Sequence, residues 1–364
     1  MPEPLNHQPD SPPDRYARSD VRVESMGSSL PSEVVSSEAL LKDTPVPVSF
    51  FKVATGIHNR RFCGPEPGNA TDGLELAVSA AENCLRVSRY EASDIDVVIC
   101  CSVVRAHKDR LLFEPVTAAI VADAIGAPTA LCFDVANACA GMANGLLLLR
   151  ALIRSGRAKV GMVVSGEQFS LISRTAANEV TGLRDAQMAS LTPGDAGMAL
   201  VVDGLGGPAD RVEDVELVTA AGHADLCAGL PSERGPGLAM YASPAQLVDE
   251  RLRTWPEFYR DHLRERKESF HDQGFTHVIQ HQVGTSVVAR MNTALRDVFE
   301  VNELPPSINT VRDYGNTAST ALFLTLHKGL VDGDITPDSK VLLGVFASGM
   351  VFGFVSLTLA GVRV

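Results

Sequence analysis

Three reactive side chains stand at similar places in the sequence, each after a short apolar run and before a stretch with helical periodicity. Cys139 lies in FDVANACAGM, His281 in HVIQHQVG and Asn316 in YGNTAST. A short apolar run is typical of a buried strand, so each residue is predicted to lie where a strand gives way to a helix. A thiol, an imidazole and a carboxamide at one place can perform nucleophilic acyl transfer.

Cys139 is the candidate nucleophile. A helix that begins at Ala140 turns its free N–H groups and its positive end toward the sulfur, which predicts a lowered thiol pKa. The small neighbours Ala138, Ala140 and Gly141 leave room for a substrate. The alternative is that Cys139 is a small buried apolar residue with no chemical role.

The other candidates would act on a carbonyl oxygen or on the sulfur. His281 can donate a hydrogen bond to a carbonyl or exchange a proton with a thiol, and its alternative role is that of a core histidine. Asn316 has the alternative role of a helix N-cap. Ser348, after the apolar run VLLGVFA, can direct a backbone N–H into the same pocket and form an oxyanion hole with the N–H of Cys139.

Apolar runs alternate with helical stretches along the whole chain. Their continuous apolar character predicts strands that are buried on both faces and covered by helices, which is an α/β fold. The predicted strands lie at residues 94–104, 130–136, 159–167, 197–204, 276–284, 307–315, 340–349 and 354–362.

The order of these elements repeats. Cys139 precedes Ser155 by the same number of residues as Asn316 precedes Asp332, and DVVICCS in the first half is paired with HVIQHQV in the second. We therefore pair Cys139 with Asn316 and predict that an internal pseudo-twofold axis brings both to His281. The predicted division is a disordered tail at 1–20, a first half at 21–204 and a second half at 205–364.

Composition limits the partners. The chain has 364 residues and a net charge of -12, which argues against nucleic acid as the main partner. Seven cysteines without a CxxC pair indicate reduced thiols in a cytoplasm, with no zinc site and no disulfide framework. The longest apolar runs are broken by glycine, so no membrane span is predicted.

Six segments in a fixed order carry a family resemblance: TGIHNRR, FDVANACAGM, GDAGMALVVDG, HVIQHQVG, YGNTAST and FASGMVFG. Over about residues 21–364 the chain resembles the thiolase superfamily and, within it, the ketoacyl synthase III branch. The resemblance implies the thiolase fold, in which two pseudo-twofold-related βαβαβ halves form a layered αβαβα sandwich. It also implies a homodimer that needs no cofactor and no metal.

The resemblance implies a role for each candidate. Cys139 would accept an acyl group from a thioester, while His281 and Asn316 would hydrogen-bond the carbonyl oxygen of a second thioester. The backbone N–H groups of Cys139 and Ser348 would hold the first oxyanion. The expected partners are acyl thioesters, carried on the phosphopantetheine of an acyl carrier protein or on coenzyme A.

The stretch at 99–126 narrows the resemblance. It is similar to the head-to-head condensing enzymes that make olefin precursors and to pyrone-forming and resorcinol-forming ketosynthases. In these relatives a glutamate before proline crosses the dimer interface and removes an α-proton from a second acyl chain. Glu114 in FEPVT matches that position. Its alternative role is a surface carboxylate at a helix start.

The sequence also departs from the family pattern. Phe50 and Ala54 stand where fatty-acid relatives use tryptophan and arginine to grip coenzyme A, which favours a carrier-bound substrate. The family's HQAN reads HQVG, and Ala347 and Ser348 replace two glycines of the terminal loop. The loop at 105–113 is charged and longer than usual, so the shape of the pocket is not carried over.

The sequence thus predicts an enzyme that joins two acyl groups by a Claisen condensation through acyl-Cys139, without release of carbon dioxide, in secondary metabolism. One alternative is a decarboxylative ketosynthase that extends a starter with malonyl carrier protein. Others are an acyltransferase to a hydroxyl or an amine, and a non-catalytic partner subunit. The retained cysteine, histidine and asparagine argue against the last alternative.

Overall fold

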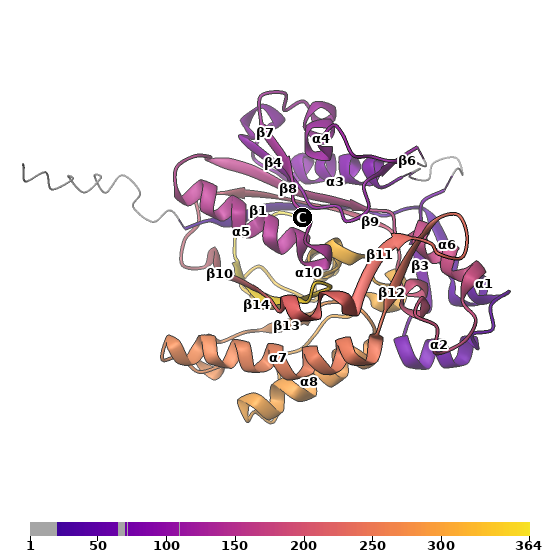
Figure 1. Ribbon diagram of the computed structural model, residues 1–364. Coiled ribbons are helices and arrows are strands. Elements are labelled where there is room, and N and C mark those ends of the chain that lie inside the picture. Colours follow the sequence, from indigo (N-terminus) through magenta and orange to yellow (C-terminus); the bar gives the residue numbers. More distant parts are fainter. Residues whose placement is uncertain (1–19, 65–69, 71, 109) are drawn as a thin grey trace, which may run out of the picture.

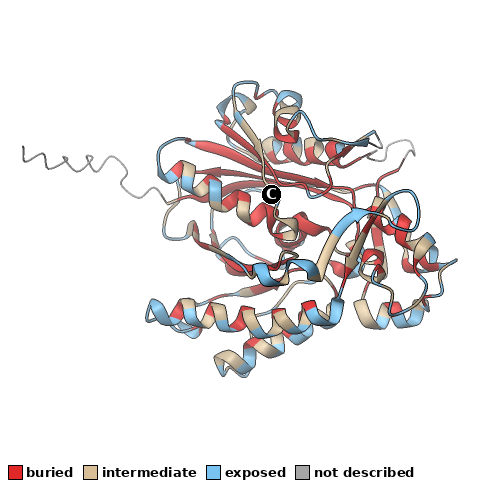
Figure 2. Ribbon diagram, viewed as in Figure 1, coloured by how far each residue is buried: buried red, intermediate tan, exposed pale blue. Residues whose placement is uncertain are grey.

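The computed structural model describes residues 20–64, 70, 72–108 and 110–364. The predicted disordered tail lies outside these residues apart from Asp20. Two β-sheets and three layers of helices alternate through the molecule (Figure 1). Buried residues concentrate in the sheets and in the helices between them (Figure 2).

The first sheet is formed by the first part of the chain. Its order is β1-β9-β8-β4-β7, with β1 (Arg22–Ser29), β9 (Ala196–Asp203), β8 (Val160–Glu167), β4 (Val97–Cys100) and β7 (Leu131–Asp134). Neighbouring residues of β4 face opposite sides, so Val98 packs under the outer helices and Ile99 packs between the sheets. This double burial explains the continuous apolar runs.

The second sheet is formed after the chain leaves β9 at Asp203. Its order is β10-β15-β14-β13, with β10 (Asp210–Thr219), β15 (Val351–Leu359), β14 (Lys340–Ala347) and β13 (His277–Gln280). β13 runs parallel to β14 and ends at Gln280. His281 therefore lies directly beyond the carboxyl end of β13.

Helices fill the layers on either side of the sheets. The outer layer on the first sheet consists of α3 (Gly73–Val87) and α4 (Thr117–Ile125), and the outer layer on the second sheet consists of α7 (Pro244–Glu265) and α8 (Thr285–Phe299) (Figure 1). The central layer, between the sheets, consists of α5 (Gly141–Arg154) and α10 (Ala321–Asp332). One buried apolar cluster fills the space between the two sheets around the central helices, and one further cluster lies under each outer layer of helices. This αβαβα sandwich is the predicted thiolase fold.

Shorter elements extend from one end of the sandwich. They comprise α1 (Ser37–Leu41), α2 (Val48–Thr55), α6 (Ser170–Glu179) and α9 (Val311–Tyr314), with the strand pairs β2 (Glu33–Ser36) and β3 (Asn59–Phe62), β5 (Ala106–His107) and β6 (Arg110–Leu111), and β11 (Cys227–Pro231) and β12 (Leu238–Ala242). Several of these elements border the cavities described below.

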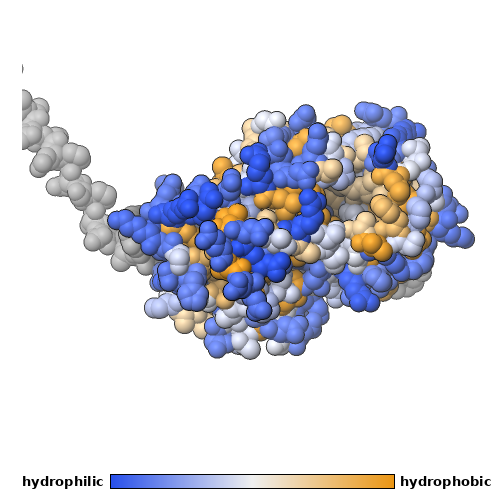
Figure 3. Space-filling view, turned by 90° about the horizontal axis from the view of Figure 1, so that it is seen from below, coloured by the Kyte–Doolittle hydropathy of each residue, from blue (hydrophilic) through white to orange (hydrophobic). Residues whose placement is uncertain are grey.

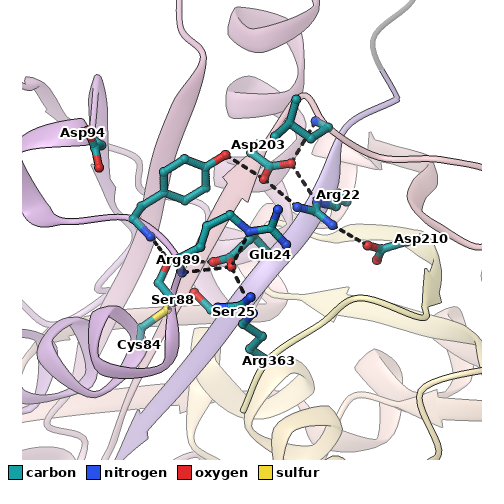
Figure 4. A network of polar contacts seen from close by, with 12 residues as sticks. Arg22, Glu24, Ser25, Cys84, Ser88, Arg89, Asp94, Asp203, Asp210 and Arg363 are labelled. Carbon is teal, nitrogen blue, oxygen red and sulfur yellow. Dashed lines mark hydrogen bonds and ion pairs between the residues drawn. The ribbon is translucent and has the colours of Figure 1, made fainter.

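A polar network joins the edge of the first sheet to the start of the second (Figure 4). Arg22 of β1 donates to Asp203 at 2.9 Å and to Asp210 at 2.8 Å. Glu24 accepts from the Ser88 hydroxyl at 2.6 Å, and its backbone oxygen accepts from the N–H of Arg363 at 3.0 Å. The network therefore holds β1, the passage between the sheets and the end of the chain together.

One predicted strand is wrong. Residues 307–310 form no strand, and 311–314 form the short helix α9. The backbone of this segment contacts β13 through the N–H of Val278, which donates to Pro306 at 3.1 Å. Pro305 and Pro306 have no N–H group to offer, so a regular ladder cannot continue. Gln282 holds the segment instead, because its Oε1 accepts from the N–H of Thr310 at 3.0 Å.

The repeat is present, but the predicted pairing of residues is wrong. Corresponding elements start 180 residues apart: β4 at Val97 and β13 at His277, α5 at Gly141 and α10 at Ala321, β8 at Val160 and β14 at Lys340. With this offset Cys139 corresponds to Ser319, and Asn316 lies three residues before it. Equal distances to the ends of the two helices misled the pairing, because α5 has 14 residues and α10 has only 12.

Two further expectations concern the chain as a whole. All seven cysteines are free thiols, as predicted. Among the described residues, no helix is both long enough and apolar enough to cross a membrane.

Candidate active site

The structure brings the three candidate side chains to one cavity. Cys139 lies between β7 and α5, His281 directly follows β13, and Asn316 follows α9. All three line a cavity of about 320 Å³. The 3₁₀ turns before α5 and α10 are in contact, which explains why residues so distant in the sequence meet here.

Two cavities meet at Cys139. The cavity that contains His281 and Asn316, here called the histidine arm, is also bordered by α2 and α7. A second cavity of about 320 Å³, here called the loop arm, is bordered by the loop residues 103–105 and 111–113, by α6 and by the strand pair of β11 and β12. Both arms share Cys139, Cys227, Met240 and Ser348.

The histidine arm lies on the side of α2 and α7. In the view from below, which faces these helices, orange surface borders a hollow in the molecule (Figure 3). The loop arm is lined mainly by large apolar side chains, among them Leu112, Phe169, Ile172 and Leu238. The two arms thus offer different surroundings to groups that reach the same thiol.

Cys139 occupies a 3₁₀ turn, Ala138–Ala140, and α5 begins at Gly141 rather than at Ala140. Ala138 has a φ of 45°, in the left-handed region. The predicted lowering of the thiol pKa is wrong, because burial raises the pKa of Cys139 to about 12. Burial disfavours the thiolate more than the charge of Arg251 and a backbone hydrogen bond favour it.

His281 is a neutral imidazole. Its side chain is 1% exposed, and neither ring nitrogen has a hydrogen-bond partner among the described residues. Burial, with a smaller contribution from Arg251, lowers the pKa of His281 to about 3. Both unpartnered nitrogens are therefore available to a ligand, which is unusual for a histidine that serves only the core.

Asn316 presents its amide nitrogen. Its Oδ1 accepts from the N–H of Ala318 at 3.0 Å, and its backbone N–H donates to Thr192 at 3.0 Å. This contact spans two residues and lies just before the 3₁₀ turn Ala318–Thr320, whose N-cap is Thr317. Asn316 is therefore not the N-cap of α10, which begins at Ala321. Because the amide oxygen is engaged, the amide nitrogen is the group left to donate.

Ser348 lies in the turn that joins β14 to β15 and lines both arms together with Cys139. Gly349, which follows, has a φ of 119°, a conformation that favours glycine. The turn thus places Ser348 beside the thiol, although this chain lacks glycine at Ala347 and Ser348.

Glu114 is exposed and is not among the residues that line either arm of its own chain. Its neighbour Phe113 lines the loop arm and is 77% exposed. The residues described here as lining the two arms include no aspartate or glutamate. A role for Glu114 at Cys139 therefore requires a second chain and stays a prediction.

Arg251 was not predicted and lines the histidine arm. It lies on the buried face of α7, which it shares with Leu247, Trp255, Tyr259 and Leu263 at a spacing of four residues. An arginine in such an apolar stripe is a signal that the sequence contains.

Glu167 at the end of β8 is a second residue that the sequence did not single out. Its carboxylate accepts from the N–H of Val103 at 3.1 Å and from the hydroxyl of Ser319. Burial raises the pKa of Glu167 to about 7, although these hydrogen bonds oppose the shift. Glu167 thus holds the backbone where the loop arm begins.

Comparisons with known proteins agree with this geometry. A family model described as 3-oxoacyl-[acyl-carrier-protein (ACP)] synthase III matches residues 133–221, and the model of its C-terminal part matches residues 267–359. A β-ketoacyl-[acyl-carrier-protein] synthase III of Clostridium novyi is 24% identical over 352 residues, which are 92% of this chain and 97% of the relative. The third enzyme of that name in Streptomyces coelicolor is 28% identical over 354 residues, 92% of this chain and 95% of the relative.

Solved structures show the same fold. FabH, a 3-oxoacyl-(acyl carrier protein) synthase III of Pseudomonas aeruginosa, has a TM-score of 0.74 at 21% identity and covers 93% of this chain and 98% of its own. Cerulenin-bound OleA of Xanthomonas campestris has a TM-score of 0.79 at 20% identity and covers 93% of this chain and 97% of its own.

The fold and the family matches define the class: this is a condensing enzyme of the thiolase superfamily. More particularly, the chain belongs to the β-ketoacyl-[acyl-carrier-protein] synthase III-like enzymes. The matched segments contain Cys139 in the first model and His281 and Asn316 in the second.

Proposed function

We propose that this protein forms a carbon–carbon bond between two acyl groups through an acyl-Cys139 intermediate. The observation that carries the proposal is the position of the thiol at the junction of two cavities, one of which contains His281 and Asn316. Two arms allow an acyl chain to lie in one while a second thioester lies in the other.

In the first step the Cys139 sulfur attacks the carbonyl carbon of an acyl thioester. The backbone N–H groups of Cys139 and Ser348 stabilise the oxyanion, and the carrier thiol leaves with the proton of the cysteine. The acyl chain then occupies the apolar loop arm. Because burial raises the pKa of Cys139, we expect the proton to leave during the attack rather than before it.

In the second step a thioester in the histidine arm becomes an enolate. The neutral imidazole of His281 and the amide nitrogen of Asn316 donate hydrogen bonds to its carbonyl oxygen, where the charge develops. The α-carbon attacks the acyl carbonyl, and the Cys139 thiolate leaves. The enolate forms when a base removes the α-proton, and we assign this role to Glu114, so no carbon dioxide is released. We place this condensation in secondary metabolism.

The base role requires a homodimer, which we propose on two observations. β7 is an edge strand of the first sheet, with a neighbour on one side only in the described chain. Phe113 and Leu131 are exposed at 77% and 58%. Exposed apolar side chains and an unpaired strand edge are typical of a surface that another chain covers.

A second candidate is a decarboxylative condensation with a malonyl group on a carrier protein. The observation that favours it is Arg251, a buried cation in the histidine arm that is suited to a carboxylate. In this reaction the enolate forms when carbon dioxide leaves, and Glu114 is not needed. Mass balance of a condensation with malonyl and saturated donors separates the two candidates.

Intact-mass measurement with acyl carrier thioesters tests the proposal. The protein is expected to gain one acyl group, which Cys139→Ala abolishes and the matched variant Cys132→Ala retains, and peptide mapping separates Cys139 from Cys227. Glu114→Ala is expected to keep the acylation and lose the condensation. A mass increase that survives Cys139→Ala contradicts the nucleophile, and equal loss of both steps in Glu114→Ala contradicts the base.

A further inference from the structure

The strongest unexplained feature is the side chain of Arg251. It is 9% exposed, and its Nε has no hydrogen-bond partner. We find no hydrogen bond or ion pair of its guanidinium with any residue that the structure describes. A buried charge without a partner lowers the stability of the folded protein. An arginine in this position is therefore expected to bind an anion as part of its function.

The other buried arginines that the structure describes have acceptors for their terminal nitrogens within the protein, although the Nε of Arg60 lacks a partner, as that of Arg251 does. The guanidinium of Arg22 pairs with Asp203 and Asp210. Arg60 donates to the backbone oxygen of Leu191 at 3.0 Å and to the Ser37 hydroxyl at 2.9 Å. The fold thus supplies acceptors to arginines that serve structure, and it supplies none to Arg251.

The surroundings of Arg251 indicate where an anion that binds its guanidinium would lie. Among the residues that line the histidine arm, it is the one with a permanent charge, and most of the others are apolar. Its charge reaches the reaction centre, because it favours the thiolate of Cys139 and opposes protonation of His281. An anion that pairs with Arg251 therefore lies in the substrate cavity, close to the thiol.

We propose that Arg251 is a specificity-determining residue that selects a second acyl substrate with a free carboxylate in the histidine arm. The planar guanidinium matches a carboxylate with two parallel hydrogen bonds, and it is more weakly hydrated than an ammonium group. This inference rests on the proposed function only in assigning the histidine arm to the second acyl group. A malonyl group and a longer dicarboxylic acyl group share the required chemistry.

The test uses two alkylating reagents of nearly equal size, iodoacetate and iodoacetamide. In both reactions the Cys139 sulfur displaces iodide and forms a thioether, but only iodoacetate carries a carboxylate. We expect Arg251→Met to lower the ratio of the iodoacetate rate to the iodoacetamide rate at Cys139 about tenfold. Arg251→Lys keeps the charge without the planar fork and is expected to lower the ratio less.

Controls separate this effect from a general loss of structure. Arg253→Met removes an exposed arginine from the same helix, where Arg253 pairs with Glu250, and is expected to leave the ratio unchanged. Arg251→Met is expected to fold and to melt at an equal or higher temperature, because it removes an unpaired buried charge. Peptide mapping assigns each adduct to Cys139 or to Cys227.

The outcomes are distinct. If iodoacetamide modifies Cys139 but Arg251→Met leaves the ratio unchanged, the inference fails and the nucleophile stands. If both reagents slow equally in Arg251→Met, Arg251 activates the thiolate and selects no carboxylate, which also overturns the inference. If neither reagent reaches Cys139 in the unaltered protein, the proposed function itself fails.

Carrier thioesters then identify the source of the carboxylate. We expect malonyl-carrier or succinyl-carrier protein to compete better than butyryl-carrier protein as the second substrate, and Arg251→Met to abolish that advantage. A malonyl advantage places the carboxylate next to the reacting carbon, and a succinyl advantage places it farther away. Equal competition by all three substrates contradicts the inference.

Discussion

The two arms that meet at Cys139 each contain an arginine, but the two arginines differ. Arg105 in the loop arm pairs with Asp134 at 3.2 Å, and its side chain is partly exposed. Arg251 in the histidine arm is buried and has no partner among the described residues. Among the described residues that line the loop arm, the one charged side chain is thus already paired, whereas the histidine arm offers donors for an oxygen atom and a cation for an anion.

Because of this difference, the two arms suit different parts of the substrates. The apolar lining of the loop arm suits an acyl chain, because burial of each methylene group contributes about 0.8 kcal/mol. The histidine arm suits the polar end of a thioester, where charge develops during the reaction. Substitutions in one arm are therefore expected to affect a different step from substitutions in the other.

The largest effect is expected in the histidine arm. His281→Ala removes a donor to the enolate oxygen, so we expect the condensation rate to fall about 10²–10³-fold while acylation of Cys139 continues. Single-turnover acylation by mass spectrometry and product formation measure the two steps separately. Parallel loss of both steps would mean that His281 serves the thiol instead, and Asn316→Ala provides a second test of the same step.

A smaller effect is expected in the loop arm. Gly229 lines this arm in β11, and a Cβ added there meets no atom within 4 Å. Alternate residues of a strand share a face, so a side chain at Gly229 projects to the same side as Cys227. Gly229→Phe is expected to fill part of the arm and to slow acylation by long acyl groups about tenfold relative to short ones, since a few methylenes lose their burial.

Gly229→Ala is the matched control for this change. It adds a Cβ without filling the cavity, and we expect it to retain the preference of the unaltered protein. A chain-length profile of Cys139 acylation measures both variants. An unchanged profile in Gly229→Phe would assign the acyl chain to the other arm.

The last comparison concerns pH and involves Glu167, which lies behind the loop arm, and His281, which lines the histidine arm. Burial raises the pKa of Glu167 from 4.5 to about 7, so the folded protein holds a proton that the unfolded chain releases at lower pH. The free energy of unfolding therefore falls as the pH rises through this window. Glu167→Gln is expected to remove this part of the slope, up to about 3 kcal/mol.

Urea denaturation at several pH values measures the slope, and parallel curves for the two proteins would contradict the raised pKa of Glu167. His281 in the histidine arm behaves differently, because burial lowers its pKa to about 3. Protonation of His281 is thus expected to cause no loss of condensation activity near neutral pH.

Much of the fold was predictable because double burial leaves a clear mark on the sequence. β8 and β9 are buried at every position, and both appear in the sequence as mainly apolar runs. β1 and β10 carry charged residues such as Arg22 and Glu213, and the sequence did not mark them as strands. The Pro305–Pro306 pair broke a predicted strand for a local reason that the apolar count ignored.

The site was predictable to a similar extent. The residue types and the local context of Cys139, His281 and Asn316 singled them out, and the structure places them in one cavity. Arg251 was missed because a stripe with one arginine looks like an ordinary amphipathic helix. Whether such an arginine finds an acceptor depends on residues far away in the sequence.

The sequence by itself determined the layered α/β architecture and the reactive residues, because hydrophobic periodicity and strand-end chemistry are local properties. Only the tertiary structure decided the true offset of the repeat, the raised pKa of Cys139 and the unpaired state of Arg251. Each of these depends on what surrounds a side chain in three dimensions. Desolvation and charge pairing depend on neighbours that the folded chain brings together, so they cannot be predicted from local sequence patterns.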